Sequence, residues 1–266
     1  MTVHCLTNRP SPLLEEGQRT FLFRDDVDLD HAVSQHKAYC DLLSTLGVQV
    51  RSLTILQDEP DSVFIEDTAL VLDELAVLAN MGTAARSREP AGVEAILREY
   101  REAVVRLDDG VTLEGGDVLR IGRTLLVGLS RRTNRCGIES LSQIVKPYGY
   151  RVESVPVSGC LHLKTGCTAV DERRLVVNPA WIDCRALSRF ELFPVPREEP
   201  WGANILRIGN QCVMAVASPR TAELVQSLGP DVRTLDISEF AKVEGGVTCL
   251  SLLWEQPGEA TSPKIA

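Results

Sequence analysis

The stretch 112-TLEGGDVLRIGRTLLVG-128 joins a polar, glycine-containing opening to an apolar strand, a turn and a second apolar strand. Short runs of aliphatic and β-branched residues around a turn indicate a β-hairpin. Similar stretches occur at 64-FIEDTALVLDELAVLAN-80, 162-HLKTGCTAVDERRLVVN-178, 201-WGANILRIGNQCVMA-215 and 244-EGGVTCLSLLW-254. The chain therefore contains five related units.

The spacing of the units is regular. Glu66 and Glu114 are 48 positions apart, Glu114 and His162 are again 48 apart, and steps of 39 and 43 lead to the last two units. A fixed period of about 40–50 residues is typical of radial blades, in which each unit covers its neighbour's hydrophobic face. The fifth unit has no second strand of its own, so we expect VHCLTN (3–8) to supply it and close the ring.

Helical patterns alternate with the strands, which indicates an α/β protein. We predict helices over 29–46, 91–105, 134–146 and 219–228. The stretch 244–254 is expected to be the inner strand of the last blade, with Cys249 facing the axis. These elements predict one catalytic domain over residues 1–254, followed by a flexible tail over 255–266.

Composition limits the classes of function. With 44% apolar residues among 266, the chain can bury a substantial core, and its net charge of −9 argues against a nucleic-acid partner. The sequence shows no signal peptide or membrane-spanning run, so we expect a cytoplasmic protein without a membrane partner. The chain has eight cysteines without Cys-x-x-Cys spacing, and we expect most of them to be reduced thiols. A homodimer is left open.

In a radial arrangement the openings of the units converge at one end of the axis. This would bring together Glu66, Asp67, Glu114, His162 and the Gly245–Gly246 pair that leads to Cys249. A Cys–His pair provides a nucleophile and a proton carrier, and the surrounding carboxylates match the N–H groups of a guanidinium. The sequence thus predicts a small, cationic, arginine-like substrate, and we expect the two glycines to leave room for it.

Five segments carry a resemblance to a known family: PDSVFIEDTA (60–69), LEGGDVLRIG (113–122), Arg-Thr-Asn (132–134), LHLKTG (161–166) and KVEGGVTCLSL (242–252). They resemble the dimethylarginine dimethylaminohydrolase family, of the guanidino-group-modifying superfamily, in order and over nearly the whole chain. The resemblance implies the pentein fold, a five-bladed ββαβ propeller. It also implies hydrolysis of N-methylated arginines to citrulline and a methylamine, without a metal or organic cofactor.

The resemblance further implies roles for individual residues. Cys249 would attack the guanidinium carbon, and His162 would protonate the departing amine and then activate water. Glu114 would orient His162, Asp67 would hold guanidinium N–H groups, and Glu66 would line the same pocket.

The resemblance also implies how the amino-acid end of the substrate would bind. Arg86 and Arg132 would bind its carboxylate, whereas Asp61 and the carbonyl of Val243 would bind its α-amino group. The segment ARSRE also offers Arg88 in place of Arg86. The stretch 15-EEGQRTFLF-23 is the expected lid.

Several alternatives stay open. Arginine deiminases and amidinotransferases resemble this architecture but carry an aspartate two residues after the histidine, where this chain has Lys164. Loss of that carboxylate favours an alkylated substrate, which has fewer N–H groups to bind. Other arginine analogues and a non-catalytic pentein-type scaffold are the further alternatives. Cys160, His162 and Cys167 fit no familiar zinc spacing, so we expect no metal site.

Overall fold

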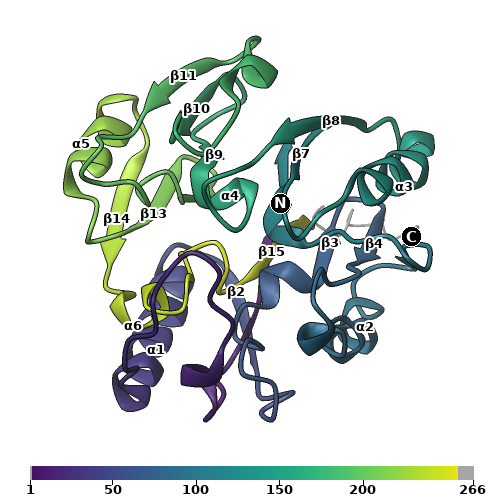
Figure 1. The fold of residues 1–266 in the computed structure, drawn as a ribbon, viewed down its shortest axis with the longest axis horizontal. Coiled ribbons are helices and arrows are strands. Elements are labelled where there is room, and N and C mark those ends of the chain that lie inside the picture. The colour runs from purple at the N-terminus through teal and green to yellow at the C-terminus, as the bar shows by residue number, and fades with distance from the viewer. Residues whose placement is uncertain (1, 257–266) are drawn as a thin grey trace, which may run out of the picture.

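The computed structural model describes residues 2–256, which form five three-stranded sheets around a common centre (Figure 1). The inner strands are β3 (Ala69–Val71), β6 (Val118–Ile121), β9 (Cys167–Ala169), β12 (Leu206–Ile208) and β15 (Leu252–Gln256). The middle strands are β4 (Leu75–Leu78), β7 (Thr124–Leu129), β10 (Arg174–Val177), β13 (Gln211–Ala215) and β1 (Thr2–Asn8). The outer strands are β5 (Ala103–Arg106), β8 (Arg151–Pro156), β11 (Glu191–Pro194), β14 (Asp231–Leu235) and β2 (Gln49–Leu53).

Each sheet has the same connectivity. The inner and middle strands pair antiparallel, and the middle and outer strands pair parallel. Parallel neighbours need a crossover, which four blades make with the helices α1 (Leu29–Thr45), α2 (Glu89–Leu97), α3 (Arg135–Val145) and α5 (Pro219–Ser227). The blade of β9, β10 and β11 uses the short 3₁₀ turn Cys184–Leu187 instead. The predicted five-bladed ββαβ architecture is therefore confirmed.

The ring closes between the two ends of the described chain. Strand β1 pairs antiparallel with β15, with Leu6 opposite Leu252, and parallel with β2. The prediction that residues 3–8 complete the fifth blade is confirmed. Glu255 and Gln256, expected to belong to the tail, are instead part of β15, and the rest of the predicted tail (257–266) lies outside the described residues.

The predicted helix over 91–105 is wrong in its second half. Helix α2 ends at Leu97, and 103–106 form strand β5, which pairs in parallel with β4. The sequence AVVR places two β-branched valines in this strand, where they favour the extended conformation. Pairing with a neighbouring strand thus outweighed the local helical pattern.

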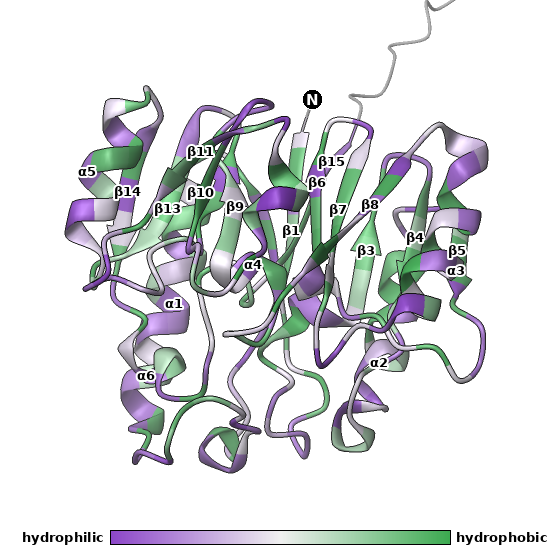
Figure 2. Ribbon diagram, turned by 45° about the horizontal axis from the view of Figure 1, so that its top comes forward, coloured by the Kyte–Doolittle hydropathy of each residue, from purple (hydrophilic) through white to green (hydrophobic). Residues whose placement is uncertain are grey.

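The core is divided among the blades. Five hydrophobic clusters are present in the described chain, and each combines residues of two neighbouring blades. One cluster contains Val77 of β4 and Val127 of β7, and the next contains Leu126 of β7 and Leu175 of β10. Figure 2 shows hydrophobic residues concentrated on the strands and hydrophilic residues on outer helices and loops. Among residues 2–256, no helix is long and apolar enough to span a membrane.

Candidate active site

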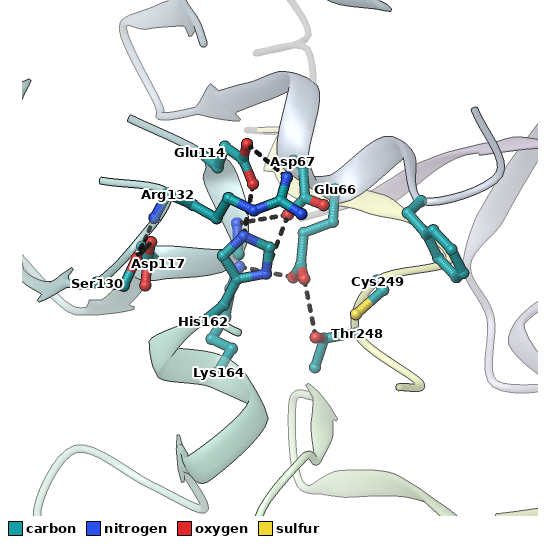
Figure 3. A network of polar contacts seen from close by, with 12 residues as sticks. Glu66, Asp67, Glu114, Asp117, Ser130, Arg132, His162, Lys164, Thr248 and Cys249 are labelled. Atoms are coloured by element: carbon teal, nitrogen blue, oxygen red, sulfur yellow. Dashed lines mark hydrogen bonds and ion pairs between the residues drawn. The ribbon is translucent and has the colours of Figure 1, made fainter. Parts of the chain in front are cut away.

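Short turns before the inner strands carry the predicted site residues. Glu66 and Asp67 belong to the 3₁₀ turn before β3, and Glu114 precedes the turn Gly115–Asp117 before β6. His162 precedes the short helix α4 (Leu163–Gly166), which leads into β9. Because each inner strand starts near the axis, the turns meet at one end of it (Figure 3).

Two glycines allow these turns to pack closely. A Cβ atom on Gly115 would lie 2.0 Å from the carbonyl oxygen of Glu66. One on Gly116 would lie 2.6 Å from Oδ1 of Asp67 and 2.7 Å from Nδ1 of His162. Any larger residue at position 116 would therefore push the His162 and Asp67 side chains apart.

His162 lies between two carboxylates. Its Nε2 is 2.6 Å from Oε2 of Glu114, and its Nδ1 is 3.7 Å from Oδ1 of Asp67. Burial lowers the pKa of His162, but Asp67 and Glu114 outweigh burial and raise this pKa to about 9. Burial also raises the pKa of Asp67, yet His162 and Arg86 bring it down to about 2. The imidazole is therefore a cation near neutral pH.

The sequence predicted that Cys249 lies within the inner strand. The structure instead places it in a turn before β15. Backbone bonds from Cys249 N–H to the Gly246 carbonyl and from Ser251 N–H to the Thr248 carbonyl hold this turn. The N–H of Gly246 donates to Sγ of Cys249 at 3.3 Å. Burial raises the pKa of the Cys249 thiol to about 12, with added repulsion from Glu66 and Asp67. These effects favour the neutral thiol at Cys249.

The room left by Gly245 and Gly246 is used by the protein itself. A Cβ atom on Gly245 would lie 2.4 Å from the ring of Phe64, and one on Gly246 would lie 2.3 Å from Oδ1 of Asn204. Gly245 also lines the small cavity beside Cys249, so the expectation that these glycines leave room for a substrate stays a prediction. They let the turn carrying Cys249 pack against two neighbouring side chains.

The structure distinguishes Arg86 from Arg88, the two arginines that the sequence offers for binding the substrate carboxylate. Arg86 is buried, with NH1 2.7 Å from Oδ2 of Asp67 and NH2 2.7 Å from Oε2 of Glu89. Arg88 is exposed and pairs with Asp58 and Glu59 instead. Only Arg86 therefore points toward the Asp67 side of the site.

Arg132 and Asp61 face the same space from other segments. NH1 of Arg132 is 3.4 Å from Oε1 of Glu114, and its NH2 donates to Oε1 of Gln18 at 3.2 Å. Both carboxylate oxygens of Asp61 accept the N–H of Gln18 at 3.2 Å. Burial raises the pKa of Asp61, although Arg86 opposes this rise.

Glu66 forms a separate arrangement beside this cluster. Its Oε1 is 2.6 Å from Nζ of Lys164, and its Oε2 accepts the hydroxyl of Thr248 at 2.9 Å (Figure 3). Glu66 and Lys164 both line a cavity of about 410 Å³ between the inner strands. Burial raises the pKa of Glu66, and Lys164 opposes the rise. Both oxygens of Glu66 are thus engaged by protein groups.

A smaller cavity of about 20 Å³ lies where the other predicted residues meet. Its lining comprises Gln18, Asp61, Phe64, Asp67, Arg86, Arg132, Leu161, His162, Val243, Glu244, Gly245 and Cys249. The structure thus brings together Cys249 and His162 with Asp61, Asp67, Arg86, Arg132 and Val243. Glu114 contributes through His162, whereas Glu66 is absent from this lining. The cavity is far smaller than ligand pockets, which measure roughly 300 Å³ or more, so the candidate site is closed in this structure.

Sequence reasoning missed two buried carboxylates that position the site. Glu89 holds Arg86 through bonds of 2.9 and 2.7 Å, and the i, i+3 spacing of these residues was the available signal. Asp117 accepts the N–H of Leu163 at 2.8 Å and the hydroxyl of Ser130 at 2.6 Å, so it fixes the loop that carries His162. Burial raises the pKa of Asp117 to about 6.

Metal binding is possible by residue type but opposed by charge. Asp67, Glu114 and His162 offer ligand atoms within 4.8 Å of one another. Arg86 and Arg132 already lie within ion-pair distance of these carboxylates. Two guanidinium groups and a protonated imidazole would repel a divalent cation, so protein groups balance the charge of this cluster.

Comparison with known proteins relates the chain to guanidine-modifying enzymes. The family model described as arginine deiminase matches residues 51–195. An N(G),N(G)-dimethylarginine dimethylaminohydrolase of Streptomyces coelicolor is 41% identical, over 93% of this chain and 95% of the relative. An enzyme of the same name from Pseudomonas aeruginosa is 31% identical, over 95% of this chain and 99% of the relative.

Solved structures show the same relation. A cysteine-to-serine variant of the Pseudomonas aeruginosa enzyme, complexed with citrulline, superposes with a TM-score of 0.91 at 29% identity, covering 96% of this chain and 100% of that chain. The N-terminal domain of a cyanobacterial arginine dihydrolase, bound to product, gives a TM-score of 0.84 at 23% identity, covering 97% and 99%. The second likeness concerns the fold alone.

Proposed function

Because the chain belongs to the dimethylarginine dimethylaminohydrolase family, with its five-bladed pentein fold, we propose that it hydrolyses N-omega-methylated arginine. The products would be citrulline and dimethylamine or methylamine. The observation that carries this proposal is the closed cavity lined by Cys249, His162 and Asp67, with Glu114 behind the histidine. A thiol, a protonated imidazole and carboxylates are the groups that cleavage of a guanidinium requires.

In the proposed reaction, the bound guanidinium favours loss of the Cys249 proton to solvent, and the resulting thiolate attacks the guanidinium carbon and forms a C–S bond. The bond from this carbon to the methylated nitrogen then breaks, and His162 gives its proton to the departing amine. A thiouronium remains on Cys249. Water attacks its carbon and gives a proton to the neutral His162, and the C–S bond breaks to release citrulline. Glu114 would hold the imidazole in place, and Asp67 would accept N–H bonds from the guanidinium.

We assign the amino-acid end of the substrate to four other residues of the cavity lining. Arg86 and Arg132 would bind its carboxylate, while Asp61 and the Val243 carbonyl would bind its α-ammonium group. All four residues line the cavity, which supports the assignment. Arg86 is favoured over Arg88 because Arg88 is exposed and pairs elsewhere.

Lys164 supports a methylated substrate over arginine itself. Its ammonium group lies 2.6 Å from Glu66 and thereby occupies a carboxylate beside the cavity. Unmethylated guanidinium has more N–H groups to satisfy, so it loses more from this arrangement than an alkylated one. A substrate with one substituted nitrogen therefore fits the available acceptors better.

The state of the cysteines supports the proposed cytoplasmic location. All eight cysteines lie within the described residues, and all are free thiols. Reduced thiols persist in a compartment where glutathione and thioredoxin keep them reduced.

Citrulline formation from asymmetric dimethylarginine, monomethylarginine and arginine tests the proposal. We expect the methylated substrates to be preferred, and Cys249→Ser to lower turnover by orders of magnitude. Cys136→Ser is the matched control, because Cys136 is exposed and outside the cavity. A folded wild-type protein that yields no citrulline from any of the three would reject the proposed function.

A further inference from the structure

The lid (residues 15–23) is held over the cavity by a carboxylate outside the proposed chemistry. Oε1 of Glu244 accepts the backbone N–H groups of three consecutive lid residues: Thr20 at 2.8 Å, Phe21, and Leu22 at 2.7 Å. Bonds from N–H groups to a carboxylate are stronger than those between neutral groups. One oxygen atom thus binds three consecutive backbone amides of the lid.

The backbone at Glu244 is arranged to present this side chain. Glu244 has a φ of +63°, a left-handed conformation that costs energy in any residue except glycine. Turn bonds from Glu244 N–H to the Ala241 carbonyl and from Gly245 N–H to the Phe240 carbonyl maintain it after the short helix α6 (Ser238–Ala241). The side chain is buried and lines the cavity beside Val243. A strained residue at this position points to a functional requirement.

Hydrophobic packing contributes little to holding the lid. Phe23 is 97% exposed and Leu22 is 38% exposed. Other lid contacts are polar: Gln18 bonds to Asp61 and Arg132, and Nε of Arg19 donates to the Lys242 carbonyl at 3.0 Å. The guanidinium of Arg131 also lies 5.4 Å from the ring of Phe21. The Glu244 carboxylate is therefore the main link between the lid and the segment that carries Val243 and Cys249.

We propose that Glu244 is a positioning residue that holds the lid closed over the cavity. The closed cavity of about 20 Å³ cannot admit an arginine-sized molecule, so the lid must open for exchange of substrate and product. Opening breaks the three bonds to Oε1, and closure remakes them. Glu244 thereby couples lid position to the backbone of Val243, next to the cavity. The kinetic part of this proposal rests on the proposed function, whereas the structural part does not.

Hydrogen exchange of the lid amides tests the structural part. In Glu244→Ala, the Thr20–Leu22 amides should exchange about ten-fold faster or more, because their acceptor is gone. Glu244→Gln keeps an acceptor oxygen and should retain part of the protection. Glu15→Ala is the matched control, since it removes an exposed lid carboxylate without a side-chain bond to these amides. Equal exchange in Glu244→Ala and the control would overturn the proposal.

Thiol labelling and kinetics complete the test. Cys249 in Glu244→Ala should react faster with a small neutral alkylating reagent, followed at that peptide by mass spectrometry, and KM should rise more than kcat falls. Glu244→Gly serves if Glu244→Ala misfolds, because glycine adopts the left-handed conformation without strain. Faster exchange and labelling without any citrulline formation would reject only the proposed function. Unchanged labelling together with unchanged exchange would reject the role of Glu244.

Discussion

The imidazole of His162 is bound to Glu114 across 2.6 Å, with Asp67 3.7 Å from its other ring nitrogen. Two carboxylates raise the pKa of a buried histidine to about 9, so the ring carries its proton at the pH where the protein would work. A proton donor is what the departure of an amine requires.

Replacing Glu114 by Gln should lower the pKa of His162, because the ring loses the negative charge at Nε2. We expect the alkaline fall of kcat/KM, near pH 9 in the wild type, to move to lower pH. The pH–rate profile with asymmetric dimethylarginine checks this. Glu16→Gln is the control, since Glu16 is an exposed residue. An alkaline limb that stays in place would show that His162 does not set it.

The thiol of Cys249 should become more acidic when a guanidinium binds. Burial with the charges of Glu66 and Asp67 raises its pKa to about 12. A bound cation between the sulfur and these carboxylates favours the thiolate and should lower the pKa. Titration of thiolate absorbance, with Cys249→Ser subtracted as background, measures the difference. The same pKa with and without a guanidinium ligand would contradict this expectation.

Arg86 and Arg88 provide a matched pair of substitutions. Arg86→Ala removes a cation from the cavity and should raise KM by about 10–100-fold, the loss expected for charge-assisted hydrogen bonds to a substrate carboxylate. Arg88→Ala removes an exposed surface ion pair and should leave KM unchanged. Steady-state kinetics on both variants decides between them. An equal rise in KM for the two would remove Arg86 from the proposed carboxylate site.

Lys164 should control the preference for methylated substrates. Lys164→Met leaves Glu66 without its ion-pair partner, so an unmethylated guanidinium could use that carboxylate. We expect the ratio of kcat/KM for arginine to that for dimethylarginine to rise by about ten-fold, measured at alkaline pH because burial raises the pKa of Glu66. Lys146→Met is the control, because Lys146 is exposed. If the ratio does not change, the ion pair has no part in specificity.

Much of the fold was predictable because one hairpin pattern recurs along the chain. The recurrence of 64–80 and 112–128 predicted the blades, and the unpaired fifth unit predicted that 3–8 would close the ring. Local patterns were insufficient where strand pairing decided the outcome. Residues 103–106 read as helix, yet they pair with β4.

In the site, too, the sequence predicted the features that follow from the repeat but not those that depend on tertiary contacts. The even spacing of Glu66, Glu114 and His162 predicted their convergence, because equivalent turns of a radial repeat meet at the axis. The φ of Glu244 and the close packing of Gly246 on Asn204 were not predictable in this way. Both depend on contacts between segments far apart in the sequence, for which a single sequence carries no periodic signal.

The pairing of β1 with β15 has a consequence for biosynthesis. Residues 2–8 occupy the middle of a sheet whose inner strand comes from 252–256, so this blade cannot be completed until residues 252–256 have left the ribosome. Cys249 lies just before that strand and would be fixed at the same late step. Pairing of segments so distant is slow to form, because the loop between them must close first. Partly synthesised chains would thus hold a nearly complete ring with an exposed strand edge but without the proposed nucleophile.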